Sequence, residues 1–280
     1  MKNFLKNSIE KLDLVAWLLV LCFFCGSALL FGGNLLLATV GAVGVIVAML
    51  LIGISIEIII ESLKNTKGIG TLTGFITNGP EAVCLLVGLV AGDIIFAAST
   101  PLGSNFMNPI LLLVAAIVCG QFSRLFRSNR LYTITTVSLT TFAAGGFFLL
   151  PRSFYLYWLA ASVVVSSTLF YLRPMETELP LEEPHSFNPN YWFLPSIGIL
   201  VVSGYYLDPI VSFAAANSLA PKGVIGFIVL ATLTSWPEFK SCLGLLRRKK
   251  ILAAILNITV SNITNIWLAA IGVATFLAGF

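Results

Sequence analysis

Charged residues are scarce in this sequence: they make up 10% of the chain, whereas apolar residues make up 58%. Soluble globular proteins carry about 25% charged residues. The longest polar stretch runs only from 173 to 190, which leaves no room for a soluble catalytic domain. The composition therefore indicates a protein that lies in the lipid bilayer, and we expect no nucleic-acid partner.

The sequence contains one histidine and five cysteines. The single histidine, His185, lies beside Glu182 and Glu183 in the polar stretch, where we expect it to be solvated. Cys22 and Cys25 have the spacing of a CxxC motif, but both fall in an apolar segment where thiolates are unfavourable, so we expect neither zinc nor a disulfide there. No set of nucleophile, base and oxyanion donors is visible, so we expect neither an enzyme nor a bound cofactor.

The sequence consists mainly of long apolar segments. They predict an all-α integral membrane protein with about nine transmembrane helices. The expected spans are 12–31, 35–62, 71–92, 94–119, 131–150, 153–172, 191–208, 223–246 and 250–279. The first is longer than the apolar core of a signal peptide, which has about 7–15 residues, so we expect an uncleaved helix.

The distribution of basic residues predicts an orientation. Most of them, from Lys2 to the cluster at 247–250, fall in loops on one side of the expected spans, and only Arg152 and Lys222 fall on the other. Because basic loops stay in the cytoplasm, we expect the N-terminus and the acidic loop at 173–190 to be cytoplasmic and the C-terminus to be outside.

One motif occurs twice at a constant offset. The first copy reads Thr-Asn-Gly-Pro-Glu at 77–81 and Gly-Ser-Asn-Phe-Met-Asn at 103–108; the second reads Thr-Ser-Trp-Pro-Glu at 234–238 and Val-Ser-Asn-Ile-Thr-Asn at 260–265. Every matched position lies 157 residues after its counterpart. With the predicted orientation, the two copies cross the membrane in opposite directions. Such inverted repeats are typical of secondary transporters, whose ion site lies between the repeats.

The repeats suggest four parts of the chain. Residues 1–34 are expected to form an extra N-terminal transmembrane helix, 35–172 a first repeat of five spans with its motif at 77–108, 173–190 the acidic cytoplasmic loop, and 191–280 a second repeat with its motif at 234–265. We expect the second repeat to be shortened, because few residues follow its motif.

The repeated residues supply oxygen atoms at the middle of the membrane. Pro80 and Pro237 each remove a helical hydrogen bond, so we expect proline-broken helices at the centre of the fold with carbonyl groups left free. An all-oxygen cavity with two carboxylates favours a hard cation such as calcium, with Glu81 and Glu238 as the metal ligands. The candidate ion-binding residues are Glu81, Glu238, Thr77, Asn78, Thr234, Ser235, Ser104, Asn108, Ser261 and Asn265.

The two glutamates also suggest exchange. A carboxylate at the centre of the bilayer costs on the order of 3 kcal/mol, and two that face each other repel. One divalent ion neutralises the pair, and so do two monovalent ions or protons. The two kinds of occupant therefore compete for one site, which is the basis of antiport by alternating access.

At these residues the sequence resembles the calcium/cation antiporter superfamily, which includes the sodium/calcium exchangers. Each inverted repeat of that family carries a Thr/Ser-Ser-x-Pro-Glu/Asp motif and then an Asn-x-x-Gly-Ser-Asn-x-x-Asn/Asp motif. Residues 234–238 match the first, and 257–265 match the second apart from Val260. The N-terminal copy keeps Thr77, Pro80, Glu81, Gly103, Ser104, Asn105 and Asn108. The resemblance implies that the two glutamates coordinate calcium and that nearby hydroxyl, carbonyl and amide groups complete the calcium and sodium sites.

Several positions depart from the family pattern. Asn78 stands where Ser is usual, and Thr100 where Asn is usual. Lys240 lies two residues after Glu238, about 200° away on a helix, so we expect it to snorkel to the cytoplasmic surface. An ammonium group paired with a glutamate would instead act as a tethered cation and silence exchange.

We therefore expect a secondary-active antiporter that exchanges calcium for sodium as transported ions. One alternative is a proton-coupled cation antiporter; another is a transport-inactive relative that serves as a membrane subunit or sensor. The family fold usually has ten spans, whereas this sequence ends at Phe280. A homo-oligomer or a partner subunit is among the ways in which the fold could be completed.

Overall fold

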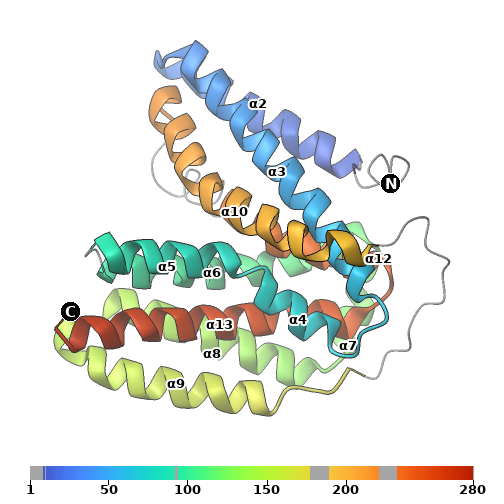
Figure 1. Cartoon of the computed structure of the whole chain (residues 1–280), viewed down its shortest axis with the longest axis vertical. Helices are drawn as coiled ribbons and strands as arrows, with labels where there is room; N and C mark the ends of the chain where they lie inside the picture. Colours follow the sequence, from blue (N-terminus) through green and yellow to red (C-terminus); the bar gives the residue numbers. More distant parts are fainter. Residues whose placement is uncertain (1–8, 10, 92–93, 177–188, 221–231, 280) are drawn as a thin grey trace. The chain divides into compact units, whose positions relative to one another are not determined.

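The computed structural model describes residues 9, 11–91, 94–176, 189–220 and 232–279, and in these residues it is helical without any β-strand (Figure 1). The α-helices are α2 (Lys11–Phe31), α3 (Leu35–Leu63), α4 (Ile69–Ile76), α5 (Gly79–Ala91), α6 (Ile94–Val118), α7 (Phe122–Arg127), α8 (Arg130–Leu149), α9 (Tyr155–Tyr171), α10 (Asn190–Ser218), α12 (Trp236–Arg247) and α13 (Ile251–Leu277). A 3₁₀ turn, η1 (Arg152–Phe154), precedes α9.

Within the described ranges, eight helical segments are long and apolar enough to cross a membrane. They are Lys11–Phe31, Leu35–Leu63, Ile69–Val90, Pro101–Val118, Arg130–Leu149, Arg152–Tyr171, Tyr191–Ser218 and Ile251–Leu277. The prediction of an all-α, multi-pass membrane protein is confirmed at this level. Most of the first half of the remaining expected span, 223–246, lies outside the described residues, and its second half contains α12.

One predicted boundary is wrong. The span expected at 191–208 is part of α10, which continues to Ser218 with Pro195 and Pro209 inside it. Proline removes one backbone donor, but neighbouring groups in a membrane protein compensate the freed carbonyl, so the helix need not end there.

Contacts between residues divide the chain into two compact units. Unit 1 comprises Met1–Ser62 and Glu182–Pro237, and unit 2 comprises Leu63–Leu181 and Glu238–Phe280. Each unit draws on both expected repeats, so the repeats and the compact units are different divisions of the chain. Both glutamates of the motif, Glu81 and Glu238, belong to unit 2.

Unit 1 contains closely packed helices. The backbone N–H of Asn34, before α3, donates to the carbonyl of Asn217 in α10 at 2.8 Å. A Cβ atom added to Gly41 would lie 2.7 Å from the Cβ of Ala214, so only glycine permits this approach of α3 to α10.

Unit 2 is arranged around α13. This helix contacts α4, α5, α6, α7, α8 and α9, and Figure 1 shows it lying lengthwise between α5 and α6 on one side and α8 and α9 on the other. Its residues from Ala253 to Ile263 are all buried. The four polar residues in this stretch are Asn257, Thr259, Ser261 and Asn262. Polar side chains inside a buried membrane helix cost free energy unless they have partners. Those of α13 therefore indicate a functional site.

A carboxylate ties the segment after α9 to the start of α4. Glu176 accepts hydrogen bonds from the backbone N–H groups of Gly70 at 3.0 Å and Thr71 at 3.1 Å. These donors belong to the first turn of α4, where N–H groups have no partner inside the helix, and a negative charge also suits this end of the helix dipole. The contact fixes the N-terminal end of the helix that leads to the first motif.

Gly74→Ala is expected to destabilise unit 2. A Cβ atom at this position of α4 would lie 2.7 Å from the backbone oxygen of Asn257 and 3.0 Å from the Cβ of Val260, both in α13. Forcing the helices apart costs about 1–3 kcal/mol, which lowers the apparent melting temperature of the purified protein. Gly103→Ala is the control, because a Cβ atom there meets nothing within 4 Å. Equal melting temperatures for both variants would contradict this packing.

Candidate ion-binding site

Glu81 and Glu238 occupy equivalent places in two helices. Each is the third residue of its helix, α5 or α12, and follows a proline. Their side chains are buried, with 8% and 0% of the surface exposed. Each carboxylate accepts a hydrogen bond from its own backbone N–H, and the two carboxylates act on each other electrostatically. The first turn of a helix favours negative charge, but it does not neutralise two buried carboxylates.

In each motif a serine hydroxyl contacts the glutamate carboxylate of the same motif. Ser104 of α6 hydrogen-bonds to Glu81. Its counterpart, Ser261 of α13, donates to Oε1 of Glu238 at 3.4 Å. Glu238 also has a hydrogen bond with Thr77, which lies between α4 and α5. The described residues therefore bring the first motif's Thr77 to the second motif's glutamate.

Four asparagines join α6 to α13. Asn105 donates from Nδ2 to the backbone oxygen of Asn262 at 3.2 Å, and Asn265 donates to Oδ1 of Asn105 at 3.1 Å. Asn108 donates to Oδ1 of Asn262 at 2.9 Å and to Oγ of Ser261 at 3.2 Å. These bonds fix the orientation of the Asn105, Asn108 and Asn265 amides, because the NH₂ group of each donates to a protein acceptor.

Four buried oxygen atoms of the repeated motifs accept no hydrogen bond from the residues that the structure describes. Oε2 of Glu81, Oε2 of Glu238, Oδ1 of Asn108 and Oδ1 of Asn265 are buried and have no hydrogen-bond partner within the described part of the chain. Buried acceptors without partners are rare and cost about 1–3 kcal/mol each, more when charged. Carboxylate and amide oxygens, here one of each kind from each motif, are ligand types that a hard cation takes.

Asn78 differs from the other predicted ligands. It lies in the interval between α4 and α5, and its Nδ2 donates to the backbone oxygens of Gly74 and Ser261, both at 3.0 Å. Its Oδ1 accepts from Oγ of Ser261 at 3.1 Å. The Asn78 side chain therefore connects α4 to α13 through hydrogen bonds.

Asn78→Leu is expected to destabilise the protein by about 3 kcal/mol, because two buried carbonyl oxygens lose their donor. The measurement is thermal unfolding in detergent. Asn217→Leu is the matched control: its side chain makes one local bond, to the Phe213 oxygen at 2.8 Å near the protein surface, and the change is expected to cost below about 0.5 kcal/mol. An Asn78→Leu protein with the same unfolding temperature as the wild type would show that these hydrogen bonds do not stabilise the packing of α4 on α13.

The structure groups most of the predicted site residues. Glu81, Glu238, Thr77, Asn78, Ser104, Asn108, Ser261 and Asn265 all belong to unit 2. Thr234 and Ser235 precede Pro237 in unit 1, and their part in the site stays a prediction. The sequence-based set omitted Asn105 and Asn262, which connect α6 and α13. Their constant offset of 157 residues within the repeated motif was the available signal.

The expected position of Lys240 is wrong. This side chain is 2% exposed, so its ammonium group does not extend to a solvent-exposed surface. The reason is the burial of α12, in which every residue from Trp236 to Leu246 is buried, so that the helix has no exposed face along which a lysine could extend. Lys240 has an interaction partner at this buried position.

Among the described residues, no group of three or more His, Cys, Asp or Glu side chains could hold a metal ion. The candidate site has only two acids, and neutral oxygens make up the rest of its polar lining. No protein-family model, curated protein or solved structure matches this chain.

Proposed function

We propose that this protein is a secondary-active cation antiporter that exchanges calcium for sodium through the site between Glu81 and Glu238. The observation that carries the proposal is the set of four buried oxygens without partners, two of them carboxylate oxygens. A cation is the simplest partner for all four, because it accepts several oxygen ligands at once.

The charge of the site favours a divalent ion. Glu81 and Glu238 are both buried and repel each other, so a single charge of +2 balances the pair. The ligands are all oxygens, which suit calcium better than a soft transition metal. Two sodium ions balance the same charge, and competition between the two occupants couples their movements.

Reciprocal contacts support the inverted repeats. Asn105 bonds to Asn262, its own counterpart 157 residues later. The bond from Asn265 to Asn105 has its equivalent in the bond from Asn108 to Asn262, with the two repeats exchanged. Pairs of this kind occur where a two-fold axis relates identical surfaces. We infer that such an axis passes between α6 and α13 and that the ion site lies beside it.

The interruption between α4 and α5 supports the proposed role of the prolines. Helix α4 ends at Ile76, α5 begins at Gly79, and Pro80 follows in its first turn. Proline suits the start of a helix, where its missing N–H costs nothing. In the proposed transporter this interval and its equivalent at Pro237 admit the ion between half-helices, with the N-terminus in the cytoplasm and the C-terminus outside.

Two other functions are distinguished by experiment. A proton-coupled antiporter has the same carboxylate pair, which can bind protons in place of sodium. A transport-inactive subunit or sensor is favoured by one observation, the burial of Lys240 two residues after Glu238.

Calcium flux into proteoliposomes tests the proposal. Purified protein is reconstituted, and calcium uptake is measured under an outward sodium gradient, an outward proton gradient or neither. The proposal expects uptake that depends on sodium. Uptake driven only by protons would establish the proton-coupled alternative, and no uptake under either gradient would favour the inactive relative.

A further inference from the structure

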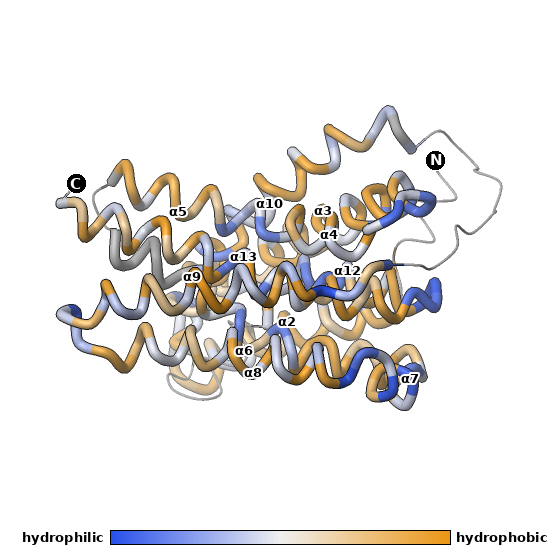
Figure 2. The backbone as a smooth tube through the Cα atoms, turned by 90° about the horizontal axis from the view of Figure 1, so that it is seen from below, coloured by the Kyte–Doolittle hydropathy of each residue, from blue (hydrophilic) through white to orange (hydrophobic). Residues whose placement is uncertain are grey.

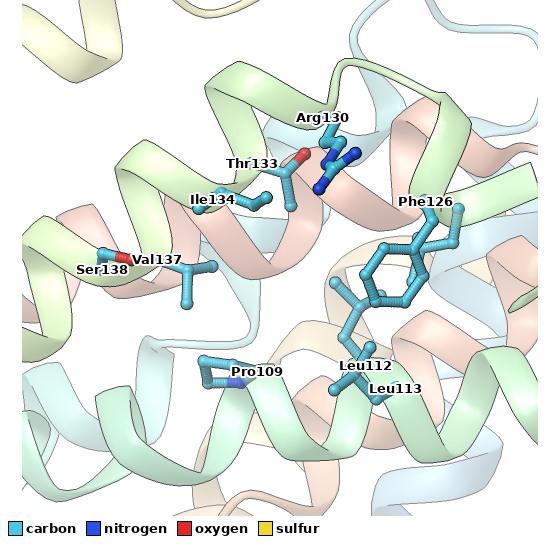
Figure 3. A pocket seen from close by; sticks show the side chains of 10 residues that line it. Pro109, Leu112, Leu113, Phe126, Arg130, Thr133, Ile134, Val137 and Ser138 are labelled. Carbon is cyan, nitrogen blue, oxygen red and sulfur yellow. The ribbon is translucent and has the colours of Figure 1, made fainter.

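A second site lies in unit 2, in a cavity formed by α6, α7 and α8. Its volume is about 190 Å³, below that of common small-molecule pockets, which hold about 300–1,000 Å³. Figure 3 shows Leu112 and Leu113 of α6, Phe126 of α7, and Ile134 and Val137 of α8 around it, with Arg130 at one end. The lining is apolar except for Arg130, Thr133 and Ser138.

The cavity is placed at the end of two membrane spans. α6 and α8 belong to the candidate spans Pro101–Val118 and Arg130–Leu149, and α7 connects them. Leu125 of α7 is buried, whereas Phe122 and Phe126 are 44% and 43% exposed, with their ring centroids 4.7 Å apart. Exposed phenylalanines on a short helix that also carries arginines are typical of an amphipathic segment at the membrane interface. The end of the cavity at Phe126 and Arg130 therefore lies where lipid tails meet headgroups.

Positive charge surrounds the same end. Arg124, Arg127 and Arg130 are all exposed, and Figure 2 shows hydrophilic positions at α7. The sequence contains no acidic residue between Asp93 and Glu176. Within the described part of the chain, no carboxylate pairs with these three guanidinium groups. Three exposed arginines at a membrane interface attract an anionic group, and arginine binds phosphate through two parallel hydrogen bonds.

We propose that this cavity binds one anionic phospholipid, with part of an acyl chain between α6 and α8 and the phosphate on Arg130 and its neighbours. The apolar lining fits a hydrocarbon chain, and the volume fits a segment of one chain better than a whole ligand. Charge complementarity selects an anionic lipid over a zwitterionic one. This inference does not depend on the ion-binding site.

Native mass spectrometry of the purified full-length protein tests the proposal. The protein is equilibrated with phosphatidylglycerol or phosphatidylcholine of identical acyl chains, and the fraction of protein with bound lipid is compared. The wild type is expected to prefer phosphatidylglycerol, and Arg130→Gln to weaken that binding by about fivefold. Val137→Trp fills the cavity and is expected to reduce phosphatidylglycerol binding even though all arginines remain. Arg152→Gln, in η1 beyond the other end of α8, is the control and is expected to retain wild-type binding.

Three results would overturn the proposal. The first is equal binding of the two lipids by the wild type. The second is an equal loss in Arg152→Gln and Arg130→Gln, which would indicate general surface charge. The third is full competition by glycerol phosphate, which would indicate a site for free phosphate. If Arg130→Gln does not fold, the comparison of Val137→Trp with the wild type decides: unchanged lipid binding would rule out the cavity.

Discussion

Glu81→Gln and Glu238→Gln are each expected to abolish calcium transport and leave the protein folded. Glutamine has the shape of glutamate and can still accept the hydrogen bonds of Ser104 or Ser261, so the local structure is kept. It removes one of the two charges that balance a divalent ion. Loss of a buried charge contact costs about 3 kcal/mol, which corresponds to a fall in calcium affinity of about 100-fold.

The measurement is calcium uptake into proteoliposomes, with thermal unfolding as the check on folding. Glu176→Gln is the control, because this carboxylate caps α4 and is not part of the glutamate pair. Calcium uptake near the wild-type rate in either glutamate variant would disprove a site shared between the two acids.

Lys240→Met is expected to lower stability strongly and to leave calcium binding in place. The side chain is 2% exposed and has an interaction partner, so its replacement removes an interaction at a buried position. Loss of a buried polar interaction costs about 1–3 kcal/mol, and more when a charge is involved. Calcium affinity should be unchanged in the fraction that remains folded, because in the proposed transporter the ion, and not the ammonium group, balances Glu81 and Glu238.

The comparison uses thermal unfolding together with binding of radioactive calcium. Lys249→Met is the matched control, because this neighbour at the end of α12 is exposed and its replacement should alter stability little. A wild type that binds no calcium, next to a Lys240→Met protein that does, would identify Lys240 as a tethered cation and the protein as a transport-inactive relative.

The membrane helices could be predicted from the sequence because their signal is local. Eight apolar segments coincide with predicted spans, since each must be long enough to cross the bilayer whatever its neighbours are. The end of α10 could not be predicted. Pro209 is typical of a helix boundary in water, whereas membrane helices tolerate proline in their interior.

The sequence predicted most residues of the site, but it did not predict which of them hydrogen-bond to each other. The offset of 157 residues marked Glu81, Ser104 and Asn108 together with their counterparts. It did not indicate that Asn105 and Asn262 connect α6 to α13, because the partner of an amide depends on how two helices cross. Asn78 had the chemistry of a ligand, yet its amide holds two backbone carbonyls.

Lys240 illustrates a further limit of sequence reasoning. Its angle to Glu238 and its closeness to the basic cluster at 247–250 favoured an exposed ammonium group. That argument assumes that one face of α12 is free. All of α12 up to Leu246 is buried, and a periodic pattern cannot reveal that a helix is buried on every face.

The most direct test of the shared site is the number of calcium ions bound per chain at equilibrium, with sodium as a competitor. The account predicts one calcium ion per wild-type chain, displaced as sodium is raised, and none in the Glu81→Gln, Glu238→Gln double variant. Calcium bound equally by the wild type and the double variant, or bound with no response to sodium, would contradict it.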